Sequence, residues 1–259
     1  MAASTKVCVI NWCKKMKDCR SIEITTLVDN NVWVRGLASS WGLSLYLEID
    51  SGERHRILMD TSGSSNALFS NAKKLEVDLS DVEAVFVSHW HLDHCGSLSH
   101  VLPLLEQQTP VYVPSMNPSG IRTIREAEGK PIVCSDPVSL MDGVMSTGEM
   151  VGGVSEHSLV INIKDVGLVV LSGCAHPEIV NIIRCAQQVS GVSKVYAVIG
   201  GFHISSKREG AKVAEVLQEL GVQLVSPCHC TGINAKQAIL AIMKTKFAKN
   251  GSGKVWSIR

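Results

Sequence analysis

The spacing of apolar residues changes along the chain: short strand-like runs come first, and strands that alternate with helices come last. Residues 82–87 form an unbroken apolar run, which is typical of a strand covered on both faces. Residues 96–105 are predicted to form a short helix. The other strands predicted in this part are residues 22–28, 42–49, 56–59 and 111–113.

In the last part of the chain, two strand-like apolar runs predict a hairpin of residues 159–163 and 168–171, with Asp165 in its turn. Apolar residues at helical spacing predict helices at 177–189, 207–220 and 235–246, and strands are predicted at 194–199, 223–225 and 254–258. Residues 115–142 are interrupted by Pro and Gly and are expected to form an irregular or partly helical insertion. The pattern favours an α+β fold, a single domain of residues 1–259 in which two mixed β-sheets pack together with helices outside, an αββα four-layer sandwich.

Composition narrows the possible environments and partners. The 259 residues are 45% hydrophobic and 19% charged, as in a globular protein with a well-buried core. Lys and Arg number 25 against 24 Asp and Glu, so no global field attracts nucleic acid or an anionic membrane. No run reaches the roughly 18 apolar residues of a membrane span, and the first residues lack a signal-peptide pattern. Nine cysteines, an odd number, then predict reduced thiols in the cytoplasm.

Candidate metal ligands crowd the segment that follows the predicted strand 82–87. His89, His91, Asp93 and His94 lie within six residues, and imidazole nitrogen and carboxylate oxygen are zinc ligands at about 2.0–2.2 Å. His89 and His91 are two apart in an extended segment and therefore point to the same side. A bend after His91 would aim Asp93 and His94 at a neighbouring point, which favours two adjacent metals. The alternative is a loop of surface histidines, but such density after an apolar strand argues against it.

Three later histidines also follow predicted strands. His176 comes after the run 168–171, His203 after 194–199 and His229 after 223–225. Side chains just past the ends of several strands can assemble a site along one rim of a sheet. These histidines are therefore candidates to complete the metal site.

These motifs resemble a known family. The run Ser88–His94, Ser-His-Trp-His-Leu-Asp-His, resembles the signature of the metallo-β-lactamase superfamily, and Ile57–Thr61 resembles its preceding strand motif. Leu-Ser-Gly-Cys-Ala-His, Ile-Gly-Gly-Phe-His and Pro-Cys-His-Cys-Thr-Gly resemble the dihydropterin–ribofuranosylaminobenzene phosphate synthase-like branch. The resemblance implies two divalent metal ions, one held by His89, His91 and His176, and the other by Asp93, His94 and His229. Zinc is the expected metal, with iron and manganese as alternatives.

One position departs from the superfamily pattern. Many members carry a bridging carboxylate where this chain has Cys174. Bridging would then rest on solvent or on the Cys174 thiolate, which a metal would deprotonate. The alternative for Cys174 is a small buried residue without a role in binding. Cys228 and Cys230 flank His229, and strand alternation predicts that both point away from it.

Further roles follow from the resemblance and from local pattern. Asp60 resembles an Asp of the superfamily that orients a ligating histidine. Alternatively, Asp60 only starts the turn that follows its strand. Asp93 and His203 are the candidate catalytic residues. His203 could bind the substrate or donate a proton, or it could have a purely structural role. The segment Ser205–Lys207 precedes or begins a predicted helix, so its residues could bind a phosphate or could simply cap the helix.

The expected activity is that of a metallo-β-lactamase-fold hydrolase, or a synthase-like transferase, which uses metal-activated water on a small, phosphorylated substrate. One alternative is a nuclease or phosphodiesterase of the same superfamily, although the balanced charge argues against nucleic acid as a partner. A second alternative is a non-enzymatic metal or redox sensor. Cys8, Cys13 and Cys19 could hold another metal or an iron–sulfur centre, but their spacing is not the usual one. His55, His100 and His157 are not predicted to be ligands.

Overall fold

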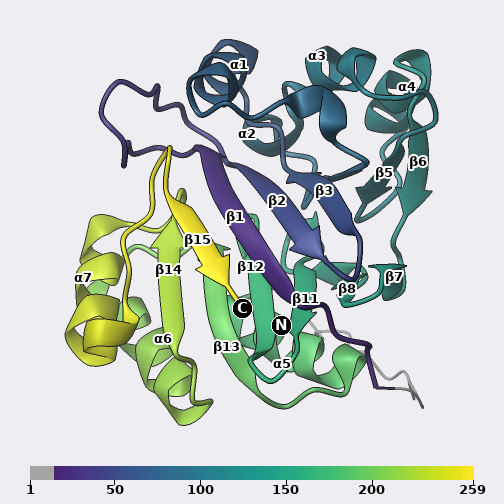
Figure 1. Cartoon of the computed structure of the whole chain (residues 1–259). Coiled ribbons are helices and arrows are strands. Elements are labelled where there is room, and N and C mark those ends of the chain that lie inside the picture. The colour runs from purple at the N-terminus through teal and green to yellow at the C-terminus, as the bar shows by residue number, and fades with distance from the viewer. Residues whose placement is uncertain (1–14) are drawn as a thin grey trace. The chain divides into compact units, whose positions relative to one another are not determined.

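The computed structural model describes residues 15–259, which form two compact units. The first unit consists of Cys19–Cys134 and Asn250–Arg259. The second unit consists of Ser135–Lys249 with residues 15–18. Each unit contains its own β-sheet and its own helices (Figure 1).

The first unit is built on a mixed sheet of seven strands in the order β15-β1-β2-β3-β4-β5-β6. Strands β15, β1, β2 and β3 pair antiparallel, with Ile24 opposite Leu47 and Leu47 opposite Ile57. Strands β3 to β6 pair parallel, so β4 and β5 end at the same edge. The strands are β1 (Ser21–Val28), β2 (Ser44–Asp50), β3 (Arg54–Met59), β4 (Ala84–Phe86), β5 (Pro110–Val113), β6 (Lys130–Val133) and β15 (Val255–Ile258).

The helices of the first unit lie on one side of this sheet (Figure 1). Buried Leu68 and Ile124 from the helices pack in one cluster with Leu58, Val85 and Val111 from the strands. Burial of such side chains contributes roughly 1.5–3 kcal/mol each. The helices are α1 (Ser65–Lys74), α2 (Leu92–Cys95), α3 (Leu98–Val101) and α4 (Pro118–Glu126), with short 3-10 turns at Leu79–Asp81 and Leu102–Leu104.

The second unit is built on a mixed sheet of six strands in the order β14-β13-β12-β11-β8-β7. The strands β12, β13 and β14 are parallel neighbours, so their carboxyl ends share one edge. The remaining pairs are antiparallel, and a separate hairpin joins β9 to β10. The strands are β7 (Val138–Met141), β8 (Val144–Ser146), β9 (Met150–Val151), β10 (Ser155–Glu156), β11 (Leu159–Ile163), β12 (Gly167–Ser172), β13 (Val195–Gly201) and β14 (Leu224–Cys228).

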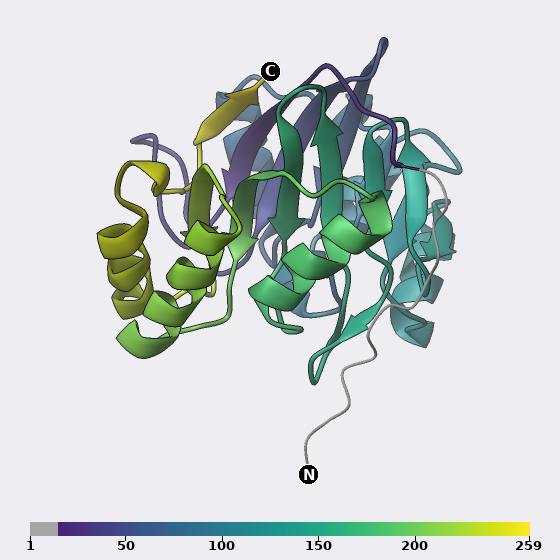
Figure 2. The same cartoon turned by 90° about the horizontal axis from the view of Figure 1, so that it is seen from below.

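Three longer helices pack against the second sheet, α5 (Ile179–Ser190), α6 (Lys207–Glu219) and α7 (Ile233–Met243), and a 3-10 turn follows at Lys244–Lys246. Figure 2 shows them on the same face of the strands. The buried side chains of Ile182, Leu217 and Ile239 form one cluster with Val170 and Val198 from the sheet. The parallel β12–β14 edge is thereby fixed by helices that connect successive strands.

Two mixed sheets with helices confirm the fold class predicted from the sequence. Asp165 lies with φ 61° in the turn between β11 and β12, which confirms the predicted hairpin. Residues 115–142, expected to form an irregular or partly helical insertion, contain the helix α4, and they also form the strands β6 and β7, which were not predicted. Asn117 caps α4 by accepting from the Gly120 N–H, and Pro118 occupies its first turn, so these residues begin a helix. Within residues 15–259, no helix is both long and apolar enough to cross a bilayer.

Candidate metal centre

The 89–94 cluster of the first unit begins immediately after the buried strand β4. His89 continues the extended chain and is fully buried, and His91 is the exposed N-cap residue of α2. The single turn of α2 then carries the half-buried Asp93 and the fully buried His94. The bend predicted after His91 is therefore present and separates the four side chains into two pairs.

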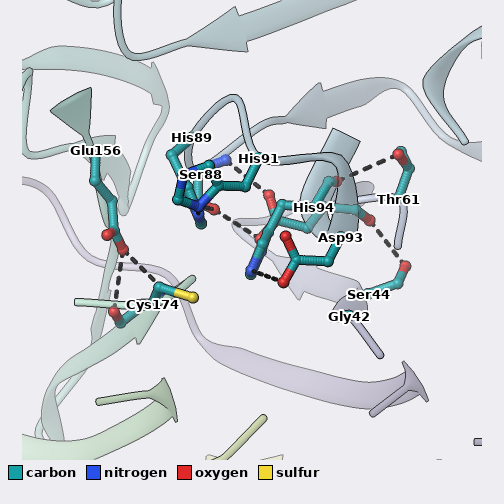
Figure 3. Close-up of polar contacts among 12 residues, drawn as sticks. Gly42, Ser44, Thr61, Ser88, His89, His91, Asp93, His94, Glu156 and Cys174 are labelled. Atoms are coloured by element: carbon teal, nitrogen blue, oxygen red, sulfur yellow. Dashed lines mark hydrogen bonds and ion pairs between the residues drawn. The ribbon is translucent and has the colours of Figure 1, made fainter. Parts of the chain in front are cut away.

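The distances within these pairs match the spacing of ligands on one cation. His89 Nε2 lies 3.1 Å from His91 Nδ1, and His94 Nε2 lies 3.7 Å from Asp93 Oδ2 (Figure 3). Two ligand atoms about 2.0–2.1 Å from one zinc ion stand about 3.4 Å apart at a tetrahedral angle. The donor set and its spacing thus fit a borderline divalent cation at each pair.

Asp60 lies behind the cluster and holds its rings in place. Its buried carboxylate faces His94 Nδ1 at 2.6 Å, which leaves Nε2 of that ring turned toward Asp93. Asp60 also accepts hydrogen bonds from the Ser88 backbone N–H and hydroxyl, both at 2.7 Å. The Ser88 hydroxyl lies 3.0 Å from His89 Nδ1. A carboxylate at the far nitrogen of a ligating histidine fixes the ring orientation and its tautomer, as expected for Asp60.

The backbone of the α2 turn is held from two other segments of the first unit. The Leu43 N–H donates to the Asp93 carbonyl at 3.2 Å, and the Thr61 N–H donates to the His94 carbonyl at 2.6 Å. Gly42 adopts φ 140°, and a Cβ there would overlap the Asp93 carbonyl oxygen. The loop at Gly42 therefore approaches α2 so closely that only glycine fits.

The second unit carries its candidate ligands at the shared carboxyl edge of three parallel strands. His176 follows β12, His203 follows β13 and His229 follows β14. The His176 and His203 rings are 4.5 Å apart between centroids, and one potential ligand atom from each lies within 4.8 Å of Cys174 Sγ. Cys174 and His229 are buried, His176 is half-buried and His203 is exposed.

Glu156 organises the loop that carries Cys174 and His176, and the sequence did not suggest this role. Its buried carboxylate accepts from the backbone N–H group of Cys174 at 3.0 Å (Figure 3) and from those of Ala175 and His176, both at 2.9 Å. Three N–H groups pointing at one anion form a tight turn, in which Ala175 takes φ 57°. The available signal was an acidic residue three positions before the predicted strand 159–163.

Cys230 points toward His229, contrary to the prediction from strand alternation. His229 has φ 47°, so the extended geometry ends at that residue and the next side chain turns back. Cys230 Sγ, Cys174 Sγ and one His229 ring nitrogen all lie within 4.8 Å of one another. The hydrogen bond with the Cys174 side chain, with smaller contributions from His229 and His203, lowers the pKa of Cys230 to about 5 against the opposing effect of burial. Cys228 remains buried in β14.

The phosphate site considered at Ser205–Lys207 is already occupied by a side chain of the helix. Ser206 caps α6 in a capping box, and its backbone N–H donates to the Glu209 carboxylate at 2.9 Å. The Ser205 N–H donates to the same carboxylate at 3.3 Å, and Lys207 is the exposed first residue of the helix. Because a carboxylate satisfies these donors, the structure supports capping rather than phosphate binding.

The remaining histidines lie outside both clusters. His157 is buried with Nδ1 2.9 Å from the Ser146 hydroxyl, His55 pairs with Glu83 at 2.8 Å, and His100 is exposed. Cys8 and Cys13 lie outside the described residues, and Cys19 is buried.

Comparisons with known proteins agree with the fold and with the 89–94 motif. Residues 41–109 match the family described as the metallo-beta-lactamase superfamily. A protein of Methanocaldococcus jannaschii named 7,8-dihydropterin-6-methyl-4-(beta-D-ribofuranosyl)-aminobenzene-5'-phosphate synthase is 26% identical, over 84% of this chain and 90% of its own.

Solved structures share the fold. A metal-dependent hydrolase of the beta-lactamase superfamily superposes with a TM-score of 0.72 at 24% identity, over 91% of this chain and 98% of its own. The metallo-beta-lactamase fold protein YhfI of Bacillus subtilis has a TM-score of 0.63 at 14% identity, over 92% and 99%. At these identities the likeness concerns the fold.

Proposed function

We propose that this chain is a metal-dependent hydrolase of the metallo-β-lactamase superfamily, or a synthase-like transferase, that acts on a small, phosphorylated substrate. The observation that carries the proposal is the pairing of ligand atoms in the first unit. His89 with His91, and Asp93 with His94, each present two ligand atoms at the spacing of one cation. Two neighbouring pairs support two cations.

Each pair needs a further ligand, and we assign these to the second unit. We propose that His176 joins His89 and His91, and that His229 joins Asp93 and His94. The placement of both histidines at the carboxyl ends of the parallel strands β12 and β14 supports this assignment. Glu156 supports it as well, because three backbone hydrogen bonds fix the loop that presents His176.

The chemistry follows from the donor set. Divalent cations held by imidazole and carboxylate activate water at neutral pH and polarise the oxygen of an ester or phosphate, and zinc is the cation we expect. The side chains of the protein keep this arrangement rigid: Asp60 holds the ring of His94, and Ser88 links Asp60 to His89. A rigid set of ligands lowers the cost of reorganisation when charge develops on the substrate.

His203 is the residue we assign to proton transfer. Its ring is exposed and lies 4.5 Å from the His176 ring between centroids, at the edge where β13 ends. An imidazole at this position can donate a proton to a leaving group. The name of the Methanocaldococcus jannaschii relative supports a phosphorylated substrate of pterin type for the transferase form of the proposal.

The test is metal-dependent turnover. Purified protein is stripped with a chelator, reloaded with zinc and assayed on phosphodiesters, lactones, thioesters and pterin pyrophosphates. Turnover should require the metal and should be lost in His91→Ala, while His100→Ala, an exposed histidine outside the cluster, should behave as wild type. Equal activity of stripped and loaded protein, or an active His91→Ala variant, would refute the proposal.

A further inference from the structure

The second unit brings two cysteines together at the edge that carries His229. Cys174 follows β12 and Cys230 follows β14, the strands on either side of β13. Cys230 Sγ lies 3.6 Å from the Cys174 carbonyl oxygen, and the two sulfur atoms and a His229 ring nitrogen lie within 4.8 Å of one another. Residues 56 positions apart thus present two thiols and an imidazole at one place.

A glycine at the end of the intervening strand makes this approach possible. A Cβ on Gly201 would lie 2.6 Å from Cys230 Sγ and 3.2 Å from Cys174 Cα. Any larger residue at position 201 would therefore push the Cys230 thiol away from Cys174. The backbone of His229, with φ 47°, completes the arrangement by turning Cys230 to the same side as its own ring.

We propose that Cys174, Cys230 and His229 form a thiolate-rich site for a divalent cation of the zinc type. Two sulfur ligands about 2.3 Å from one zinc ion stand about 3.8 Å apart, so atoms already within 4.8 Å need only a small closure to share one ion. Each thiol releases its proton to solvent when the cation binds. Burial of Cys174 and His229 shields the cation from water, which strengthens its attraction to thiolate.

This site gives the protein a preference among metals. Thiolate ligands favour zinc and other soft or borderline cations, whereas carboxylate and water ligands suit magnesium and manganese. The inference rests on the proposed function in one respect, because His229 is a ligand both in the thiolate-rich site and in the metal site of the proposed function. The cation bound by His229 is then zinc-like, and manganese does not replace it.

Cobalt(II) provides the test, because thiolate bound to cobalt gives a charge-transfer band in the near ultraviolet that imidazole and carboxylate do not give. The metal-free full chain is titrated with Co²⁺ in five forms: wild type, Cys174→Ser, Cys230→Ser, the Cys174→Ser/Cys230→Ser double variant and Cys228→Ser. Cys228→Ser is the matched control, because Cys228 flanks His229 on its other side but is buried within β14. Circular dichroism confirms that each variant is folded.

We expect the band in wild type and in Cys228→Ser, at about half intensity in each of the other single variants, and none in the Cys174→Ser/Cys230→Ser double variant, since two thiolates contribute. Visible d–d bands without a charge-transfer band in wild type would overturn this inference and leave the proposed function standing. Absence of any cobalt binding would overturn both.

A competition on wild type keeps the test decisive if a serine variant does not fold. Zn²⁺ or Cd²⁺ should displace Co²⁺ and abolish the charge-transfer band, while excess Mn²⁺ should leave it unchanged. Displacement by Mn²⁺ would overturn the inference.

Discussion

Replacing Glu156 by alanine removes the carboxylate that accepts hydrogen bonds from three consecutive backbone N–H groups of the second unit. These donors belong to Cys174, Ala175 and His176, at 2.9–3.0 Å from the carboxylate. A buried donor left without its acceptor costs about 1–3 kcal/mol. Because half-buried His176 allows some water to enter, we place the loss for Glu156→Ala at about 3–5 kcal/mol, near the upper end for single substitutions.

Glu156→Gln should cost less. One oxygen of the glutamine can still accept from Cys174 and Ala175, but its NH₂ group then faces the His176 N–H. The loss of one charge-assisted hydrogen bond is worth about 1.5–3 kcal/mol. The order of stability should therefore be wild type, then Glu156→Gln, then Glu156→Ala.

Urea unfolding of the metal-free protein measures these differences without a contribution from bound cation. Glu149→Ala is the matched control, because Glu149 is a half-buried carboxylate that accepts one hydrogen bond, from the Ser155 hydroxyl at 2.6 Å. Its replacement should cost about 0.5–1.5 kcal/mol. If Glu156→Ala unfolds at the same urea concentration as Glu149→Ala, the carboxylate does not hold this loop and the reasoning fails.

Three further predictions concern the first cluster and a helix cap. Asp60→Asn should weaken metal binding about 10- to 100-fold in a chelator competition, because His94 loses its anionic partner; unchanged affinity would contradict this. Gly42→Ala should lower the melting temperature and the retention of metal, because the added Cβ overlaps the Asp93 carbonyl oxygen. A melting temperature equal to that of wild type would contradict this close approach. Hydrogen bonds from the capping serine lower the pKa of Glu209, so its contribution is present at neutral pH and is lost as pH falls through that lowered pKa. Wild type should therefore melt above Glu209→Gln at pH 7, and the difference should disappear as the pH falls through the lowered pKa of Glu209; a pH-independent difference would refute the cap.

The sequence predicted the first cluster well because its information is local. His89, His91, Asp93 and His94 lie within six residues after one apolar strand. The two-residue alternation of an extended chain and the bend after His91 are therefore enough to predict where these side chains point. Strand–helix alternation in the last third predicted the strands β12, β13 and β14 and the helices between them for the same reason, whereas their parallel order comes from the structure.

The contributions that escaped prediction depend on contacts between distant residues or on a single backbone angle. Glu156 acts on residues 18 to 20 positions away through backbone donors, and no side-chain pattern reports such contacts. The direction of Cys230 depends on the positive φ of His229, whereas the prediction assumed continued extension. Helix α1 was not predicted, although Ser64 caps it by accepting from the Ala67 N–H.

The central claim is that six side chains, His89, His91, Asp93, His94, His176 and His229, hold two divalent cations. Native mass spectrometry of the zinc-loaded chain tests it most directly. The account predicts two zinc ions per wild-type chain, and the loss of zinc from one site in His176→Ala and from the other in His229→Ala. A wild-type chain that retains no zinc, or variants that both keep two ions, would contradict it.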